Sequence, residues 1–249
     1  MHLGCVELGA VAYWVMKAVL TPLLRFFYRV RVEGVDNVPV GAPAILASNH
    51  VSFSDSFFLP LVLRRRITFV AKAEYFEDRK TAWFFRAMGQ IPIKRIGGSA
   101  SEGALAAARD VLDGGGLFGI YPEGTRSPDG RLYKGHTGVA RLALQTRAPV
   151  LAVAMIGTRE AQPIGQVMPR LFMPVTIRIS APLTFERYYE RADDPHVLRA
   201  ITDEVMFELR ELAGQTYVNA YAKRKDVPEA AGAEPAPGSR SPLPVAAAV

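Results

Sequence analysis

Between residues 30 and 215, short apolar runs alternate with longer segments in which apolar residues recur every three or four positions. Short apolar runs are typical of buried strands, and the three-to-four spacing is typical of helices with one face on a core. The runs predict strands at 44–48, 67–71, 89–93, 117–121, 150–156 and 175–179. The segments between them predict helices at about 55–64, 78–88, 101–113, 136–147 and 196–213.

Strands that alternate with helices predict an α/β fold, in which a sheet of about six or seven mostly parallel strands is flanked by helices. We expect this domain to occupy residues 33–222. Residues 1–32 form a separate apolar, membrane-associating helical segment in this interpretation. Residues 223–249 are rich in Pro and Ala and predict a disordered tail.

The stretch from Leu3 to Leu24 is strongly apolar, but Glu7 and Lys17 interrupt it. A membrane-spanning helix needs about 20 apolar residues, more than this stretch provides without a charge. Three arginines follow between positions 25 and 31, with three aromatic residues among them. This pattern favours a monotopic helix in the membrane interface, and the alternative is a terminal helix packed on the core.

The net charge of +6 and the isoelectric point near 9.5 favour acidic partners, namely an anionic membrane or a phosphorylated substrate. The basic residues are spread along the chain without a recognition motif, so no nucleic-acid partner is predicted. The single cysteine, Cys5, excludes an internal disulfide bond. The presence of only one cysteine also makes a reducing compartment the simplest interpretation. The four histidines lack metal-ligand spacing, so no metal ion is expected.

Residues 49–55 read NHVSFSD and directly follow the predicted strand 44–48. On a continuous helix, side chains five residues apart diverge. His50 and Asp55 can therefore meet only if the chain turns between them, with His50 at a strand end and Asp55 in the first turn of a helix. Such a pair is a candidate for catalysis. The alternative is that Asp55 serves only as a helix N-cap.

Polar and basic residues also follow the strands in GQIPIKR (89–95) and YPEGTRS (121–127), and more follow in LYKGHTG (132–138). Ligands of open α/β sheets bind at the carboxyl ends of strands, and the planar fork of an arginine suits a phosphate. The alternative for 121–127 is a surface turn with an ion pair between Glu123 and Arg126. The candidate binding residues are Lys94, Arg95, Glu123, Gly124, Thr125, Arg126 and Lys134.

Four blocks in order resemble the glycerolipid acyltransferases of the lysophosphatidic acid acyltransferase type. Residues 49–55 match the family's NHxxxxD block, and residues 121–127 match its aromatic-Pro-Glu-Gly-Thr-Arg-Ser block. Residues 89–95 resemble the second block, a glycine-initiated apolar strand that ends in arginine. Residues 148–153 resemble the fourth, a proline within an apolar strand.

The resemblance implies transfer of a fatty acyl group from a thioester donor, acyl-coenzyme A or acyl carrier protein, to the hydroxyl of lysophosphatidic acid. The product is phosphatidic acid. The resemblance implies His50 as the general base and Asp55 as the residue that orients it, with no metal or redox cofactor. It also implies a protein on the cytoplasmic face of the cell membrane, held there as a peripheral or monotopic protein.

The same resemblance assigns the remaining candidates to the lysophospholipid acceptor. Arg126 and Arg95 hold its phosphate, together with Lys94 or Lys134. Glu123 binds an acceptor hydroxyl or orients Arg126.

Pro92 and Lys94 depart from the second block, in which an aromatic and an acidic residue are common at these positions. One alternative therefore keeps the chemistry but changes the acceptor to another lysophospholipid or a glycosylated phosphoinositide. A second is a non-catalytic lipid-binding membrane adaptor. A third is a thioesterase or lipase, which the absence of a GxSxG nucleophile elbow disfavours.

Overall fold

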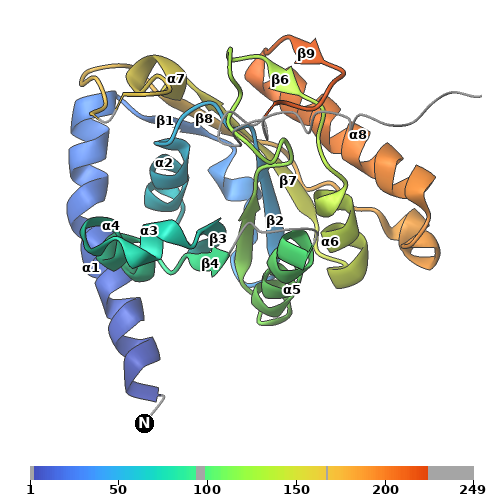
Figure 1. Ribbon diagram of the computed structural model, residues 1–249, viewed down its shortest axis with the longest axis horizontal. Helices are drawn as coiled ribbons and strands as arrows, with labels where there is room; N and C mark the ends of the chain where they lie inside the picture. The colour runs from blue at the N-terminus through green and yellow to red at the C-terminus, as the bar shows by residue number, and fades with distance from the viewer. Residues whose placement is uncertain (1–2, 94–98, 167, 224–249) are drawn as a thin grey trace, which may run out of the picture.

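A computed structural model describes residues 3–93, 99–166 and 168–223 of the chain (Figure 1). The strands of its main sheet are Arg31–Glu33 (β1), Ala44–Ser48 (β2), Ile67–Lys72 (β3), Ile91–Ile93 (β4), Leu117–Ile120 (β5), Val150–Ile156 (β7) and Thr176–Ile179 (β8). Their order is β1-β8-β7-β2-β5-β3-β4. All neighbouring pairs are parallel except β7 and β8, so the predicted mostly parallel α/β sheet is confirmed.

The predicted helices are also confirmed, and their ends move by at most two residues. The α-helices are Leu3–Tyr28 (α1), Asp55–Val62 (α2), Glu74–Glu77 (α3), Arg79–Ala87 (α4), Ser99–Asp113 (α5), Gly138–Thr146 (α6), Thr158–Ala161 (α7) and Pro195–Ala213 (α8). Two 3₁₀ helices, Val35–Asn37 (η1) and Glu186–Arg191 (η2), complete the helical elements of the described ranges.

The predicted strand 89–93 begins only at Ile91. Gly89 instead ends the preceding helix, because its φ of 65° is left-handed and its N–H bonds to the carbonyl of Arg86. The sequence did not predict β1, α3, α7 or the two-stranded sheet of β6 (Leu132–Tyr133) and β9 (Tyr217–Val218). These elements are four residues or shorter, too short to display a period. Most of the predicted tail, residues 224–249, lies outside the described residues.

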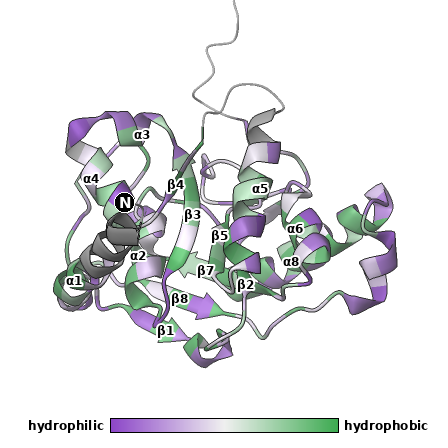
Figure 2. Cartoon of the chain, turned by 90° about the horizontal axis from the view of Figure 1, so that it is seen from below, coloured by the Kyte–Doolittle hydropathy of each residue, from purple (hydrophilic) through white to green (hydrophobic). Residues whose placement is uncertain are grey.

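Helices cover both faces of the sheet: α1, α2 and α4 lie on one side, and α5, α6 and α8 lie on the other (Figure 2). Successive residues of the central strands therefore enter different cores. Leu46 and Val153 pack in the core that contains α2, whereas Ile45 and Val150 pack in the core that contains α6 and α8. Burial on both faces explains why these strands are continuous apolar runs.

One face of α1 packs against the end of α2. The Tyr13 hydroxyl and the Lys17 ammonium donate to the carbonyl of Pro60 at 3.3 and 3.1 Å, and Lys17 also donates to the carbonyl of Leu63. These carbonyls belong to the C-terminal turn of α2, where helical partners are missing. Burial lowers the pKa of Lys17 to about 8. None of the described helices is long and apolar enough to cross a bilayer.

Strands β7, β2, β5, β3 and β4 run in the same direction, so their carboxyl ends meet along one side of the sheet, here called the carboxyl edge. The residues after β2 and β5 are consequently neighbours. Because β8 runs in the opposite direction, it begins at this edge, as does its parallel neighbour β1. The C-terminal end of α1, which precedes β1, therefore also reaches the carboxyl edge.

Gly119 of β5 has no space for a side chain, because a Cβ atom there would lie 2.2 Å from the ring of Phe69 on β3. We expect Gly119→Ala to lower the free energy of unfolding by about 1–3 kcal/mol, the usual cost of overpacking a core. Urea denaturation measures this change. The control is Gly103→Ala on the exposed side of α5, where a Cβ meets nothing within 4 Å. It should raise the same free energy by up to about 1 kcal/mol. Equal effects of the two substitutions would contradict the prediction.

Candidate active site

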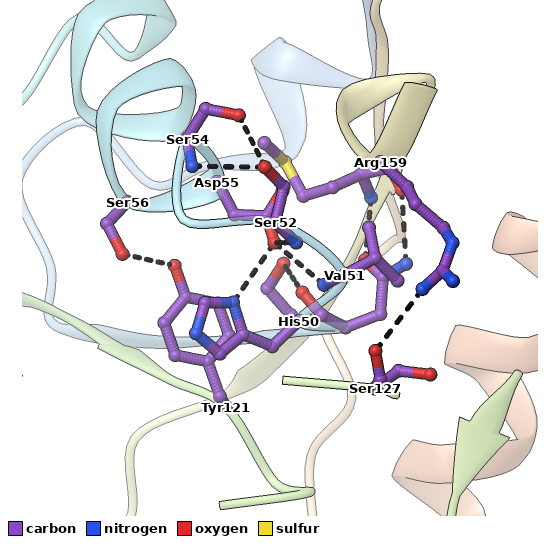
Figure 3. Close-up of polar contacts among 12 residues, drawn as sticks. His50, Val51, Ser52, Ser54, Asp55, Ser56, Tyr121, Ser127 and Arg159 are labelled. Carbon is purple, nitrogen blue, oxygen red and sulfur yellow. Dashed lines mark hydrogen bonds and ion pairs between the residues drawn. The ribbon is translucent and has the colours of Figure 1, made fainter. Parts of the chain in front are cut away.

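His50 and Asp55 lie in contact, with Nδ1 of the imidazole 3.0 Å from Oδ2 of the carboxylate (Figure 3). His50 follows the end of β2, and Asp55 is the first residue of α2, so the chain turns between them as the sequence predicted. Asp55 is fully buried, whereas 16% of the His50 side chain is exposed. A carboxylate only accepts hydrogen bonds, so Nδ1 carries the proton and Nε2 is left with its lone pair.

The carboxylate of Asp55 is held by the turn that precedes its helix. Its Oδ2 also accepts hydrogen bonds from the backbone N–H groups of Val51 and Ser52, both at 2.8 Å. Ser54 occupies the N-cap position of α2 but makes no side-chain capping bond. Asp55 therefore binds the His50 turn instead of the N-terminal N–H groups of α2, which disfavours the interpretation as a simple helix cap.

The imidazole of His50 is also fixed by an aromatic stack. The Tyr121 ring lies parallel to it, with centroids 3.9 Å apart and an interplanar angle of 14°. Phe69 stacks on Tyr121 at 5.4 Å, and the Tyr121 hydroxyl lies 3.1 Å from Oγ of Ser56 (Figure 3). Burial, and secondarily the charge of Asp55, raise the pKa of Tyr121, so its hydroxyl stays protonated. The stack and the Asp55 bond together restrict rotation of the imidazole.

Glu123 supports the backbone of His50. It is buried, and its two oxygens accept hydrogen bonds from the N–H groups of His50 at 3.2 Å and Tyr133 at 2.8 Å. The carbonyl of His50 accepts a further bond from the N–H of Ser127 at 2.7 Å. Burial raises the pKa of Glu123 to about 7, although the two N–H donors partly oppose this. The turn after β5 thus holds both backbone polar groups of His50.

Arg126 is half-buried and forms no hydrogen bond or ion pair with any described side chain, including Glu123. The alternative of a surface turn closed by that ion pair is therefore not what the structure shows. Gly124 has a left-handed φ of 70°, which glycine adopts readily, and it lets the turn bend between Glu123 and the half-buried Thr125. The guanidinium of Arg126 is left available for a ligand.

Lys134 follows β6, and its ammonium lies 5.7 Å from the ring centroid of Tyr221. The loop that carries it is joined to the Glu123 turn, because the N–H of His136 donates to the carbonyl of Pro122 at 2.8 Å. Lys94 and Arg95 lie outside the described residues. Within the described ranges no three His, Cys, Asp or Glu side chains form a group that could hold a metal ion.

Three polar side chains that the sequence analysis did not select hold the loops of the site. The amide of Asn49 exchanges two hydrogen bonds with the backbone of Met155, at 2.7 and 3.1 Å, and donates to Oε1 of Gln215 at 2.9 Å. Gln215 in turn donates to the carbonyl of Gly130 at 2.6 Å. Arg159 donates to the carbonyls of Ser127 and Pro128, both at 3.3 Å. No local signal identifies Gln215, which lies 166 positions from Asn49.

Comparison with known proteins identifies relatives of this chain. The chain is 34% identical over 140 residues to the 1-acyl-sn-glycerol-3-phosphate acyltransferase LPAT1, chloroplastic, of Arabidopsis thaliana, which is 56% of this chain and 39% of that protein. It is 27% identical to the uncharacterized protein Rv0502 of Mycobacterium tuberculosis, over 85% of this chain and 68% of the relative. The chain thus matches only about two-fifths of the length of its relatives named as 1-acyl-sn-glycerol-3-phosphate acyltransferases from Arabidopsis thaliana, Brassica napus and Chlamydomonas reinhardtii.

The fold has a solved counterpart in the 1-acyl-sn-glycerophosphate acyltransferase PlsC from Thermotoga maritima. The TM-score is 0.57 at 24% identity, over 83% of this chain and 95% of that chain. A family model described as Acyltransferase matches residues 29–156, more than half of the 249 residues. The matched range contains β2, β5 and the whole His50 and Glu123 constellation. The chain therefore belongs to the Acyltransferase family.

Proposed function

We propose that this protein transfers a fatty acyl group from acyl-coenzyme A or acyl carrier protein to the free hydroxyl of lysophosphatidic acid, which yields phosphatidic acid. The observation that carries the proposal is the His50–Asp55 pair at the carboxyl edge, with Nε2 of the imidazole free to accept a proton. The family membership and the names of the chloroplastic relatives support the reaction and the acceptor.

In this reaction Nε2 of His50 takes the proton of the acceptor hydroxyl as its oxygen bonds to the thioester carbonyl carbon. The carbon–sulfur bond of the tetrahedral intermediate then breaks, and the leaving thiolate takes the proton back from the imidazolium. Asp55 keeps the imidazole in the required tautomer and stabilises its positive charge. General-base assistance of this kind contributes about 10²–10⁴-fold to the rate.

The acyl group passes directly from donor to acceptor in this proposal. Ser52 and Ser54, which lie between His50 and Asp55 in the chain, are buried and engaged elsewhere. Oγ of Ser52 lies 2.8 Å from Oγ of Ser54 and donates to the carbonyl of Gln162 at 2.8 Å. Neither serine is bonded to His50, so the geometry supports an attacking substrate hydroxyl instead of an acyl-enzyme.

The acceptor phosphate is bound by Arg126 in this proposal. The arginine follows β5 in the turn that bonds to the backbone of His50, and its guanidinium has no partner among the described residues. A guanidinium donates to two phosphate oxygens at once, which suits a phosphomonoester. Lys134, and Lys94 and Arg95 outside the described residues, are further candidates for the same phosphate.

The acceptor and product are membrane lipids, so we place the protein at the cytoplasmic face of the cell membrane as a peripheral or monotopic protein. The apolar residues that α1 exposes, Trp14, Val15, Val19, Leu23 and Phe26, support this placement. The reaction as written balances without a metal ion or a redox cofactor.

The test of the proposed function is thiol release from acyl-coenzyme A with lysophosphatidic acid, with other lysophospholipids, with a glycosylated phosphoinositide and without acceptor. We expect release that depends on lysophosphatidic acid. Preference for another acceptor would change the substrate and keep the chemistry. Acceptor-independent release would identify a thioesterase, and no release with any donor would favour the lipid-binding adaptor.

Removal of the base or its orienting carboxylate should abolish transfer. We expect His50→Ala and Asp55→Asn each to lower kcat by about 10²–10⁴-fold, because the first removes the proton acceptor and the second cannot stabilise the imidazolium. Steady-state thiol release measures the effect. Asp110→Asn on the exposed side of α5 is the control and should match the wild-type rate. Retention of more than about a tenth of the activity in His50→Ala would exclude a general-base role.

Loss of Arg126 should weaken binding of the acceptor substrate and leave binding of the acyl donor unchanged. We expect Arg126→Ala to raise KM for lysophosphatidic acid by roughly ten- to a hundred-fold, since a charged contact contributes about 1.5–3 kcal/mol. Arg126→Lys should recover only part, because a point charge cannot bind bidentately. Arg109→Ala on the exposed side of α5 serves as the matched control. If KM for acyl-coenzyme A rises and that of the acceptor does not, Arg126 faces the donor instead.

Glu123 should make the stability of the protein depend on pH. Its pKa is about 7 in the folded protein and near 4.5 when unfolded, so the folded protein keeps a proton that the unfolded chain releases. The contribution of Glu123 to the free energy of unfolding therefore falls as pH rises from about 4.5 to 7 and is constant above. Urea denaturation between pH 5 and 8 should show that Glu123→Gln loses this slope. The same slope in both proteins would be inconsistent with a raised pKa.

A further inference from the structure

The segment that joins α7 to β8 exposes large apolar side chains. Met168, Leu171 and Phe172 have 79%, 51% and 58% of their surface exposed. Isolated exposed apolar residues are ordinary, but a group of them on one connecting segment marks an interaction surface. Residues 162–166 and 168–175, which join α7 to β8, are called the connecting segment below.

The connecting segment is attached to the end of α1. The N–H of Phe172 donates to the carbonyl of Phe27 at 2.6 Å, and the N–H of Val175 donates to that of Tyr28 at 3.1 Å. The Phe172 ring lies 6.5 Å from that of Phe26 and 5.8 Å from that of Phe27, between centroids. Phe172 holds a left-handed φ of 63°, which bulky residues rarely adopt, so these contacts fix an aromatic side chain in an exposed position.

On α1 the exposed apolar residues continue this surface. Val15, Val19, Leu23 and Phe26 follow one another at intervals of four, four and three residues, which places them on one side of the helix. The other side of α1 binds α2 and carries the buried Tyr13 and the half-buried Lys17. The α1 stripe and the connecting segment together are called the apolar rim.

The apolar rim ends beside the candidate active site. The connecting segment leaves the carboxyl edge after β7 and returns to it at β8, as Figure 1 shows near α7. Its start is bonded to the turn between His50 and Asp55, because Oγ of Ser52 donates to the carbonyl of Gln162. A lipid that entered from the rim would therefore reach the base without crossing the sheet.

The charges along the apolar rim have one sign. The sequence contains no Asp or Glu from residue 8 to 32 or from residue 161 to 185. Arg25, Arg29 and Arg170 are exposed in these two stretches. Apolar side chains bordered only by arginines complement a bilayer with anionic head groups, which accepts the apolar groups and the positive charge at the same interface.

We propose that the connecting segment is a second membrane contact, which inserts Met168, Leu171 and Phe172 beside α1 into the interface of an anionic bilayer. Two membrane contacts fix the orientation of the domain relative to the bilayer, which a single helix does not. They hold the carboxyl edge, and with it His50, next to the lipid. The purpose of this orientation rests on the proposed function, but membrane binding by the segment is measured independently of catalysis.

The first test is binding of the full chain to phosphatidylcholine vesicles that contain phosphatidylglycerol. We expect the combined variant Met168→Ser, Leu171→Ser and Phe172→Asn to lower the partition constant by at least about ten-fold, since each side chain loses its apolar burial. Asparagine tolerates the left-handed backbone at position 172. The matched control is Phe207→Ser on α8, which is also 58% exposed and should change binding less than about two-fold.

The second test does not depend on the folding of the combined variant. We expect Phe172→Trp to be quenched by lipids with brominated acyl chains, above the background of Trp14 and Trp83, and Phe207→Trp to add no quenching. Wild-type vesicle binding by the combined variant, or an unquenched tryptophan at 172, would overturn the inference. A concentration-dependent dimer that the combined variant loses while vesicle binding is unchanged would overturn it as well, and would assign the surface to a second copy.

Acyl transfer separates this inference from the proposed function. In the combined variant, turnover of a short-chain acceptor in the absence of vesicles should equal that of the wild type, and turnover of vesicle-bound acceptor should fall. If neither protein transfers an acyl group, the proposed function fails and the two binding tests still decide the membrane contact.

Discussion

The parallel pairing of β2 with β5 on one side and β7 on the other is the constraint on which the site depends. It brings the turns after three strands to one edge, where His50, the Glu123 turn and Arg159 become neighbours although they are far apart in sequence. A shift of one residue in either register would turn the side chains of β2 to the opposite faces of the sheet. Because helices bury both faces, such a shift would disrupt both cores, and the register is fixed by packing on each side.

Two buried carboxylates organise this edge by the same chemistry. Asp55 accepts from the N–H groups of Val51 and Ser52, and Glu123 accepts from those of His50 and Tyr133. Burial of a carboxylate is unfavourable unless donors replace its water, and backbone N–H groups in a turn supply them at fixed positions. The imidazole is thereby held by its own backbone as well as by its ring contacts, which suits a base that must meet a substrate hydroxyl in one orientation.

One side of α1 packs on the domain, as one interpretation of its sequence expects, and its other side is apolar and exposed, as the proposed membrane contact requires. One side binds the end of α2 through Tyr13, Lys17 and Thr21, and the other exposes apolar residues beside arginines. A helix that is apolar nearly all round, with a single lysine directed inward, meets both conditions. Packing on the domain gives this exposed side a fixed direction relative to the carboxyl edge, which a flexible anchor would not have.

Much of the fold follows from the sequence alone, because hydrophobic periodicity reports which residues face a core. The predicted strands and the predicted helices, which run from 8 to 19 residues, were confirmed. The His50–Asp55 contact was predicted because the chain can turn between a strand and a helix within the five positions that separate the two residues. The tertiary structure decided which segments are neighbours. The stacking of Tyr121 on His50, the support of His50 by Glu123 and the bond between Asn49 and Gln215 depend on strand order and register across 71, 73 and 166 positions. Periodicity is a property of one segment, whereas these contacts belong to pairs of segments, and only the folded sheet brings the pairs together.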